Sequence, residues 1–302
     1  MKRNSSLLVL FICMMIFSQQ SFAQKLSELK PQIENILKKY KAKVGVAIHN
    51  QDYNDSLIFQ GDHHFPFQST YKFHLGIAVL DQVDKGKLKL DQVVEISKAK
   101  VTTELYSPIK DKYPNGTTLP LSEILYYTIA ESDNVGCDIL FELLGGTEVV
   151  DKYFKDLGYK NFDIKLTEEV QQANWDRQFE NWTTVGASNQ VLHDYYVNKE
   201  NRLSPESYKF LWDTMRATKT GQDRIVNLLP KGTIVAHKTG TSGRNRKTGE
   251  IAATHDIGVV TLPNSNVFYI SVLVSESWED DANSAKIIAE VAKAAWDFYT
   301  SK

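Results

Sequence analysis

Cysteine is nearly absent from this chain of 302 residues, which has only Cys13 and Cys137. Cys13 lies in an apolar segment near the start, so Cys137 is the one thiol in the remainder and no intramolecular disulfide is expected there. The chain also lacks a basic excess, since 35 Lys and Arg residues face 37 Asp and Glu residues. Binding to a phosphate backbone needs clustered positive charge, so we expect no nucleic-acid partner.

Motifs for metal or nucleotide binding are missing as well. No glycine-rich phosphate loop, cysteine cluster or His-Glu-x-x-His segment occurs, and the seven histidines are scattered. His63 and His64 are adjacent, but neighbouring side chains rarely converge on one ion, so a loop is the better interpretation. We therefore expect chemistry without a metal and without a cofactor.

Residues 1–23 have the features of a signal peptide. Lys2 and Arg3 precede an apolar run over 7–17, and a small-x-small segment at 21–23 suits signal peptidase. The run is shorter than the roughly 20 apolar residues that span a bilayer, and no later run is longer. We expect a mature chain that is exported to the periplasm or secreted, has no membrane anchor and is a monomer.

The hydrophobic pattern predicts strands near both ends of the chain and helices between them. Helical spacing and capping signals at Thr147, Gly158, Ser204 and Pro205 predict helices over 26–41, 119–130, 133–144, 147–157, 204–216 and 281–299. Short apolar runs predict strands over 44–48, 56–59, 233–236, 255–261 and 267–274. We predict one sheet built from distant segments, a mostly helical lobe over 69–217 inserted into it, and a site in the cleft between them.

The spacing Ser-x-x-Lys places a hydroxyl and an amine on one helix face, where the amine can help to activate the oxygen. This spacing begins at Ser27, Ser69, Ser97 and Ser107. Ser69 follows the aromatic-proline stretch 65–67 and opens an apolar helix, whose unpaired N–H groups can stabilise an oxyanion. Ser69 and Lys72 are thus the candidate pair, and the alternative is that Ser69 only caps the helix.

Two further motifs follow along the chain. Ser132-Asp133-Asn134 occurs once, between two helical segments, where a simple capping turn is the alternative. Lys-Thr-Gly occurs at Lys219, Lys238 and Lys247. The copy at Lys238 continues a predicted strand, and an edge strand with small residues lets a substrate lie along its backbone while the lysine supplies charge.

Together, in this order, the three motifs are typical of class A β-lactamases and penicillin-binding proteins. The mature sequence resembles a class A serine β-lactamase over essentially its whole length, and segments 65–72, 132–137 and 236–242 are most similar to the PER/VEB-type extended-spectrum branch. The resemblance implies an α/β-α fold with an antiparallel five-stranded sheet flanked by helices, plus an inserted all-helical lobe. It implies a single catalytic domain over 24–302, with an α/β lobe at about 24–64 and 218–302 and a helical lobe at about 65–217.

The resemblance also implies an activity, the hydrolysis of β-lactam antibiotics through a serine acyl-enzyme, which gives antibiotic resistance. Ser69 is the implied nucleophile, and either Lys72 or Glu168 is its base. Ser132 relays a proton to the leaving nitrogen, and Glu168, matched by its distance from Asn181 and Trp182, activates the deacylating water. The backbone N–H groups of Ser69 and Thr241 are the implied oxyanion hole. The implied substrate-binding residues are Asn134, Gln172, Arg224, Lys238, Thr239, Gly240, Thr241 and Ser242.

The sequence departs from the family pattern around the loop that carries Glu168. Gln172 stands where relatives commonly have an Asn that helps to hold the water, and Leu166 and Asn181 stand where an Arg–Asp ion pair usually braces the loop. Glu169 is a neighbour that could be confused with Glu168. Arg224 matches the alternative carboxylate-supporting position used in the PER/VEB-type branch.

Other functions share parts of this pattern. A soluble DD-peptidase has the same motifs but lacks a deacylation Glu in this loop, and a β-lactam sensor needs a membrane segment or a signalling partner domain. A structural or adhesive exported protein would require three ordered coincidences. Tyr106 is either an aromatic residue at the cleft entrance or a packed loop residue. Ser242 and the unusual loop favour room for bulky cephalosporin side chains.

Overall fold

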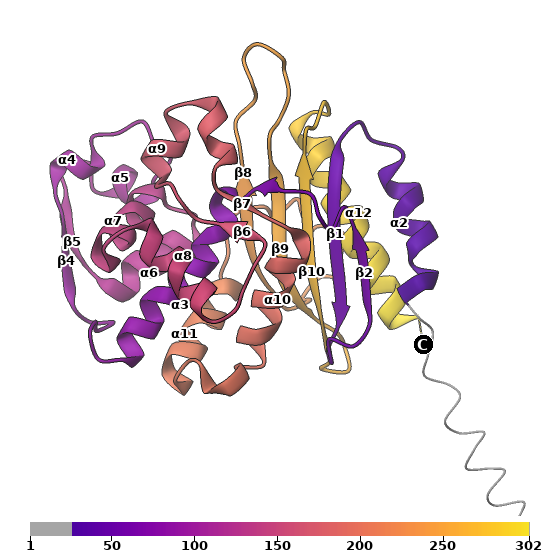
Figure 1. Ribbon diagram of the computed structural model, residues 1–302, viewed down its shortest axis with the longest axis horizontal. Helices are drawn as coiled ribbons and strands as arrows, with labels where there is room; N and C mark the ends of the chain where they lie inside the picture. The colour runs from indigo at the N-terminus through magenta and orange to yellow at the C-terminus, as the bar shows by residue number, and fades with distance from the viewer. Residues whose placement is uncertain (1–25, 302) are drawn as a thin grey trace, which may run out of the picture.

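The computed structural model describes residues 26–301, so the predicted signal peptide lies outside the described residues. Its central sheet is antiparallel and five-stranded, in the order β2-β1-β10-β9-β8 (Figure 1). The strands are Lys43–Asn50 (β1), Ser56–Phe59 (β2), Val235–Thr241 (β8), Thr254–Thr261 (β9) and Val267–Ser275 (β10). The fold class predicted from the sequence is therefore confirmed, and β8, which carries the Lys238 motif, is an edge strand.

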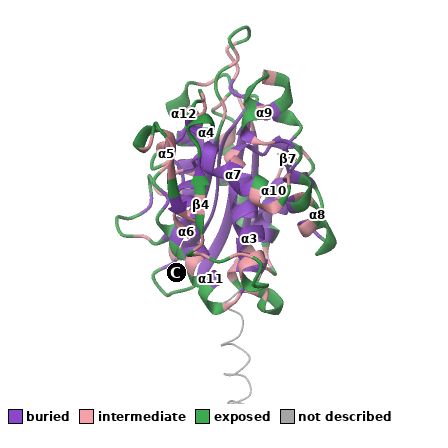
Figure 2. Cartoon of the chain, turned by 90° about the vertical axis from the view of Figure 1, so that its left-hand side faces the viewer, coloured by how far each residue is buried: buried purple, intermediate pink, exposed green. Residues whose placement is uncertain are grey.

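Helices cover both faces of this sheet, because its strands are apolar on both sides. Along β10, Phe268, Ile270 and Val272 belong to one buried cluster with α2 (Lys30–Leu37) and α12 (Asp281–Thr300). The alternating residues Tyr269 and Leu273 belong to a second cluster, on the side of α10 (Val185–Tyr196). Figure 2 shows the buried residues lying between the helices and the sheet. The sheet is thus held rigidly from both faces.

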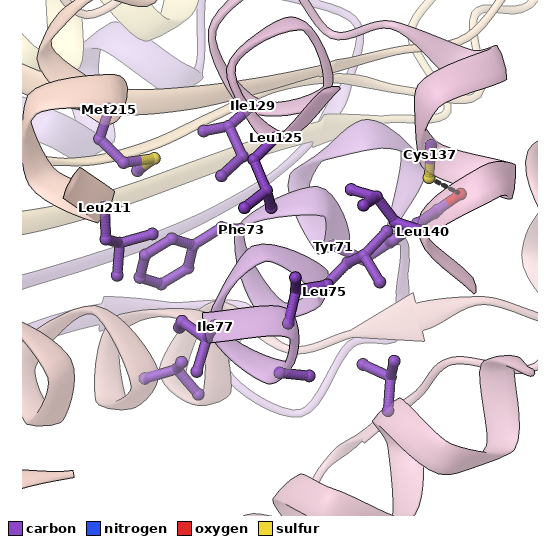
Figure 3. Close-up of a cluster of buried hydrophobic side chains, with 14 of the residues drawn as sticks. Tyr71, Phe73, Leu75, Ile77, Leu125, Ile129, Cys137, Leu140, Leu211 and Met215 are labelled. Carbon is purple, nitrogen blue, oxygen red and sulfur yellow. Dashed lines mark hydrogen bonds between the residues drawn. The ribbon is translucent and has the colours of Figure 1, made fainter. Parts of the chain in front are cut away.

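The remaining helices are grouped together, with the buried helix α3 at their centre. They are α3 (Tyr71–Asp84), α4 (Lys98–Val101), α5 (Pro108–Lys112), α6 (Leu121–Ala130), α7 (Asn134–Leu144), α8 (Thr147–Asp156), α9 (Glu168–Gln172) and α11 (Pro205–Arg216). Figure 3 shows Phe73 of α3 beside Leu211 of α11, and the Tyr71 hydroxyl directed at Cys137 of α7, 3.6 Å from its sulfur. Because α3 is packed from several sides, the residues at its N-terminal end are fixed in place.

Two small sheets flank the helical layer, and the sequence pattern missed both. One pairs β4 (Val93–Ile96) with β5 (Thr117–Pro120), and the other joins β3 (Phe65–Pro66), β7 (Trp182–Thr183) and β6 (Phe162–Asp163). The helix predicted over 119–130 therefore begins two residues later, at Leu121, because β5 occupies the residues before it. The region 69–217 is consequently less helical than expected.

Two of the predicted helix boundaries, at Ser204 and Gly158, are confirmed. Ser204 caps α11 by accepting a hydrogen bond from the Ser207 N–H at 3.2 Å, and Gly158 has the left-handed φ of 87° expected just beyond a helix. Thr147 is not the cap of α8, because it is already helical and Gly146 precedes it. The helix predicted over 26–41 ends earlier, at Leu37. The strand predicted over 233–236, which leads into the Lys238 motif, lies later in the chain, over Val235–Thr241.

Every helix within residues 26–301 is too short or too polar to traverse a lipid bilayer.

Gly45 of β1 gives a test of how tightly the sheet is joined to the segment that precedes Ser69. A Cβ atom at this position would lie 2.4 Å from Phe65 Cε2 and 2.7 Å from Val185 Cγ1. Replacing Gly45 with Ala should lower the free energy of unfolding by about 1–3 kcal/mol, because two buried side chains must move. Urea denaturation measures this change.

Gly186 of α10 is the matched control, since an added Cβ atom there meets no atom within 4 Å. Gly186→Ala should leave the stability unchanged or raise it by up to about 1 kcal/mol, as Ala favours helix. Equal denaturation midpoints for the two variants would contradict the close packing of β1 on Phe65.

Candidate active site

Ser69 lies in a single 3-10 turn, Gln68–Thr70 (η2), that leads directly into α3. Its hydroxyl does not cap the helix but accepts a hydrogen bond from Lys72 Nζ at 2.8 Å. Gln68 has a left-handed φ of 46° and is held by a 2.8 Å hydrogen bond from its Nε2 to Gln178 Oε1. Another Ser-x-x-Lys serine, Ser107, is in contrast a helix cap that accepts from the Lys110 N–H.

Lys72 is the point at which three segments of the chain meet. Its ammonium group is completely buried and lies 2.8 Å from Glu168 Oε1 in an ion pair. It also donates to the Ser132 carbonyl oxygen at 3.1 Å and to Asn134 Oδ1. A buried ammonium is tolerated only with such partners, so these contacts fix the Ser69 turn, the Ser-Asp-Asn turn and the Glu168 loop relative to one another.

Glu168 points toward the serine. Its Oε1 accepts from the Ser69 hydroxyl across 3.4 Å, while Oε2 accepts hydrogen bonds from Gln171 Nε2 at 2.6 Å and Gln172 Nε2 at 2.8 Å. Only 1 % of Glu168 is exposed, whereas the neighbouring Glu169 is exposed to solvent. Burial and direction therefore distinguish the two glutamates, which the sequence left ambiguous.

The charges of this pair are set by mutual attraction. Burial alone would raise the pKa of Glu168, but the Lys72 ammonium and the amides of Gln172 and Gln171 outweigh burial and hold that pKa below its usual value. Burial alone would lower the pKa of Lys72, but the Glu168 carboxylate chiefly reverses this and leaves it raised. The resting site thus contains an ammonium and a carboxylate.

A second buried lysine serves the other side of the site. Lys238 Nζ donates to Ser132 Oγ at 3.0 Å, and the exposed fraction of Lys238 is 0 %. Burial, followed by the nearby Lys72 ammonium, holds the pKa of Lys238 well below its usual value. Asp133 caps α7, accepting from the N–H of Gly136 at 2.7 Å, so Ser132 is free to face Lys238.

The edge of β8 presents backbone to the cleft. The Ser242 N–H donates to the Ala253 carbonyl oxygen on the adjacent strand side at 2.9 Å, so the preceding N–H, that of Thr241, points the opposite way, toward the open edge. Arg224 reinforces this end of the strand by donating to the carbonyl oxygen of Gly240 at 2.9 Å and to Thr241 Oγ1 at 2.6 Å. Burial lowers the pKa of this guanidinium.

A cleft of about 1140 Å³ opens between these elements. Of the residues selected from the sequence, it is lined by Ser69, Ser132, Asn134, Glu168, Gln172, Thr239, Thr241 and Ser242. The other four, Lys72, Arg224, Lys238 and Gly240, lie directly behind this lining and contact it. Tyr106, 55 % exposed, also lines the cleft. Within residues 26–301, no three His, Cys, Asp or Glu side chains are grouped so as to hold a metal ion.

The loop that carries Glu168 is braced without an ion pair. Asn181 is fully buried; its Oδ1 accepts from the Lys165 and Leu166 N–H groups at 2.7 and 2.8 Å, and its Nδ2 donates back to the Leu166 carbonyl oxygen at 2.8 Å. The three hydrogen bonds join Asn181 to the segment around Leu166, the two positions at which the usual Arg–Asp ion pair is missing. The loop is therefore supported by uncharged hydrogen bonds instead of an ion pair.

Asp138 is a site residue that the sequence analysis missed. From α7, its carboxylate accepts from the N–H of Glu168 at 2.7 Å and from that of Glu169 at 3.0 Å, which fixes the start of α9. Burial and the Glu168 charge raise the pKa of Asp138 to about 7. The sequence contains one signal for Asp138: it lies one helical turn after Asn134 and so on the same helix face. No spacing rule, however, connects Asp138 to a loop thirty residues away.

Known proteins with the same arrangement identify the family. The model of the β-lactamase enzyme family matches residues 28–299. β-Lactamase VEB-1 of Pseudomonas aeruginosa is 48% identical over 271 residues, which cover 90% of this chain and 90% of that protein. The chain belongs to the class A β-lactamase family, in its PER/VEB-type branch. The family and activity predicted from the sequence are thereby confirmed: the chain is a β-lactam hydrolase, an activity that gives antibiotic resistance.

Two other β-lactamases show the same relationship. The extended-spectrum β-lactamase PER-1 of P. aeruginosa is 38% identical over 96% of this chain and 94% of its own length. The crystal structure of a β-lactamase from Chitinophaga pinensis DSM 2588 superposes with a TM-score of 0.87 at 41% identity, covering 90% of this chain and 100% of that one. The class A fold therefore extends over nearly all of the described chain.

Asp138 gives this class A enzyme a predictable pH dependence. Its folded-state pKa of about 7 lies above that of an exposed aspartate, so the folded protein binds this proton more tightly than the unfolded chain. The contribution of Asp138 to the free energy of unfolding should therefore fall as the pH rises from about 4 to about 7, and Asp138→Asn should remove this contribution from the measured slope. Urea denaturation at pH steps across this range measures the slope.

The exposed Asp62 supplies the control, because Asp62→Asn removes the same charge without touching the loop. If the Asp138→Asn and Asp62→Asn proteins had parallel stability curves, Asp138 would not be the group responsible.

Proposed function

We propose that the chain hydrolyses β-lactams with Ser69 as nucleophile and Glu168 as the base of both half-reactions. In the resting site Lys72 already carries a proton, whereas Glu168 is ionised and lies 3.4 Å from the Ser69 hydroxyl. Glu168 is thus the group able to accept the serine proton, directly or through a water, while the Lys72 ammonium lowers the cost of forming the alkoxide. This contact between the Ser69 hydroxyl and Glu168 is the observation on which the proposal rests.

The remaining steps follow from the same geometry. The lactam carbonyl oxygen is bound by the N–H groups of Ser69 and Thr241, and such donors are typically worth about 10²–10³ in rate each. As the ring opens, Ser132 passes a proton to the departing nitrogen and is reprotonated through Lys72 by the proton that Glu168 took from Ser69, so Glu168 is ionised again. Lys238, 3.0 Å from Ser132 Oγ, supports that transfer. Glu168, oriented by Gln171 and Gln172, then activates a water that cleaves the acyl ester.

Substrate binding is assigned to the residues that surround this centre. We propose that Lys238, Thr239, Thr241 and Arg224 hold the ring carboxylate, with Gly240 and Ser242 presenting the strand edge, and that Asn134 contacts the acylamido side chain. Gln172 replaces the family Asn in orienting Glu168. The cleft volume of about 1140 Å³ supports acceptance of bulky, extended-spectrum cephalosporins as well as penicillins.

The buried Glu168 separates this proposal from the DD-peptidase alternative. A peptidoglycan peptidase needs no loop carboxylate on its acyl-enzyme, whereas a β-lactamase must hydrolyse that ester. Relatives that carry the β-lactamase name support the same choice. We further propose that residues 1–23 are removed on export to the periplasm or the exterior, and that residues 24–302 act as a monomer. This single domain would have an α/β lobe at about 24–64 and 218–302 and a helical lobe at about 65–217.

Glu168→Gln tests the assignment of Glu168 as the base of both half-reactions. The amide keeps the size of the side chain but cannot take a proton from Ser69 or from water, so acylation and deacylation should each slow by about 10²–10⁴-fold, and the acyl-enzyme, once formed, should persist. Intact-protein mass spectrometry after mixing with a cephalosporin should show the mass of the protein plus the opened drug. Ser69→Ala is the control that should show neither turnover nor adduct. Normal turnover by Glu168→Gln would move the base to another residue.

A further inference from the structure

The proposed oxyanion hole is built from two separate elements of the chain. Its donors are the N–H groups of Ser69 and Thr241, and Ser69 belongs to η2, whereas Thr241 ends β8. Both donors can reach one carbonyl oxygen only if the turn and the strand keep a fixed separation. The contacts between η2 and the strand pair β8–β9 therefore decide whether the hole forms.

Gly240 sets how closely the turn and the strand approach. A Cβ atom at this position would lie 3.1 Å from Gln68 Cβ and 3.2 Å from Thr70 Cγ2, so β8 packs directly on the Ser69 turn. A larger residue would press on the turn. A glycine permits this approach but does not hold it, so another group must keep the strand and the turn together.

His255 of β9 supplies this link. It lies opposite Gly240 in the strand register, so its side chain is on the same face of the sheet. Its Nε2 lies 2.8 Å from the carbonyl oxygen of Pro66, three residues before Ser69. Among the residues that the structure describes, this is the only hydrogen bond between the segment 65–70 and either β8 or β9.

The imidazole of His255 is a neutral hydrogen-bond donor. It is completely buried, and burial lowers its pKa to about 4, so the ring is uncharged at neutral pH. The Pro66 carbonyl oxygen can only accept, so the single ring proton is on Nε2, and Nδ1 has no partner within the described part of the chain. The ring of Phe65 is perpendicular to the imidazole, with centroids 6.2 Å apart, so packing also fixes its orientation.

The backbone of His255 connects the same residue to the substrate side of the strand. Arg224 Nη1 donates to the His255 carbonyl oxygen at 2.7 Å and to that of Gly240 at 2.9 Å, so the guanidinium spans the paired residues. Strand β9 is paired with β8 on one side and with β10 on the other. His255 is therefore a fixed point from which the Ser69 turn can be held.

We infer that His255 is a positioning residue of the oxyanion hole, which holds Ser69 at the correct distance from Thr241 through the Pro66 carbonyl group. This inference rests on the proposed function, because it assumes that these two N–H groups bind the lactam carbonyl oxygen. One such donor is typically worth about 10²–10³ in rate, and a displaced donor keeps part of that value, so loss of the link should lower kcat by about 10- to 100-fold. KM should change by no more than about threefold, because the groups that hold the ring carboxylate stay in place.

Met and Gln are the matched replacements for His255, because they have the same length and differ in the terminal group. The Gln amide can donate from about the place of the imidazole Nε2, so His255→Gln should keep kcat within about threefold of the wild-type value. His255→Met has no donor and should show the full loss. His255→Phe, which keeps a ring beside Phe65 but has no donor, should behave like His255→Met and replaces it if that variant does not fold. Rates are divided by the concentration of active sites, titrated with a β-lactam, so that partial unfolding does not count as lost activity.

A second readout measures the hole itself. In a Glu168→Gln background the acyl-enzyme persists, and the infrared stretching frequency of its ester carbonyl falls as the hydrogen bonds to that oxygen strengthen. His255→Met and His255→Phe should raise this frequency, and His255→Gln should leave it at the background value. A purely structural role for His255 would lower the stability of the protein without moving the frequency.

His49→Met is the matched control, because it removes another buried histidine from the same sheet. His49 lies on β1, and its ring contacts Asn189 and Tyr53 rather than the segment 65–70. This variant should lower the free energy of unfolding but leave kcat per active site and the carbonyl frequency unchanged.

The outcomes separate the two proposals. If His255→Met and His255→Phe keep the wild-type kcat and the background frequency, or if His49→Met changes both equally, His255 does not position the hole and the hydrolytic mechanism stands. If the Glu168→Gln protein forms no adduct that depends on Ser69, the proposed function fails and the role of His255 fails with it. A loss of kcat and a rise in frequency that His255→Gln alone avoids support the positioning role.

Discussion

A buried ion pair between Lys72 and Glu168 is the constraint on which the rest of the site depends. Two charges removed from water cost several kcal/mol each unless geometry and extra hydrogen bonds compensate. Here the carboxylate accepts from two glutamine amides, and the ammonium contacts Ser69, Ser132 and Asn134. Neither charge can move without leaving the other uncompensated, so the pair fixes three chain segments that come from different parts of the sequence.

The scaffold around this pair removes the remaining freedom. Helix α3 is buried along most of its length and carries Lys72 in its first turn, while Asp138 of α7 holds the N–H groups at the start of α9. Asn181 fixes the other end of the loop with uncharged hydrogen bonds. An amide that both accepts and donates can replace a charged brace in a buried position, because it satisfies the same backbone groups without a desolvated charge.

Sequence reasoning recovered the parts of this design that are local or linear in the chain. The central strands, the cap at Ser204 and the three motifs are visible because periodicity, cap chemistry and short spacing are properties of neighbouring residues. The small sheets were missed because strands such as Phe65–Pro66 are too short to show a period. Asp138 was missed, and Asn181 was noted only as a departure from the family pattern. Both side chains bind backbone groups of a distant loop, and the sequence does not indicate which backbone groups a side chain will bind.

The contrast between the two buried lysines shows how one environment produces two different groups. Lys72 faces a carboxylate and keeps its proton firmly, whereas Lys238 faces only neutral oxygens, those of Ser132 and its own neighbour Thr239, and its pKa falls far below the ordinary value. A ring carboxylate bound beside Lys238 would do for it what Glu168 does for Lys72, stabilising the charge that burial disfavours. In the proposed mechanism, substrate binding therefore favours the charged form of Lys238. The Lys238 ammonium that the substrate stabilises in this way lies against Ser132, the residue that we propose delivers a proton to the leaving nitrogen.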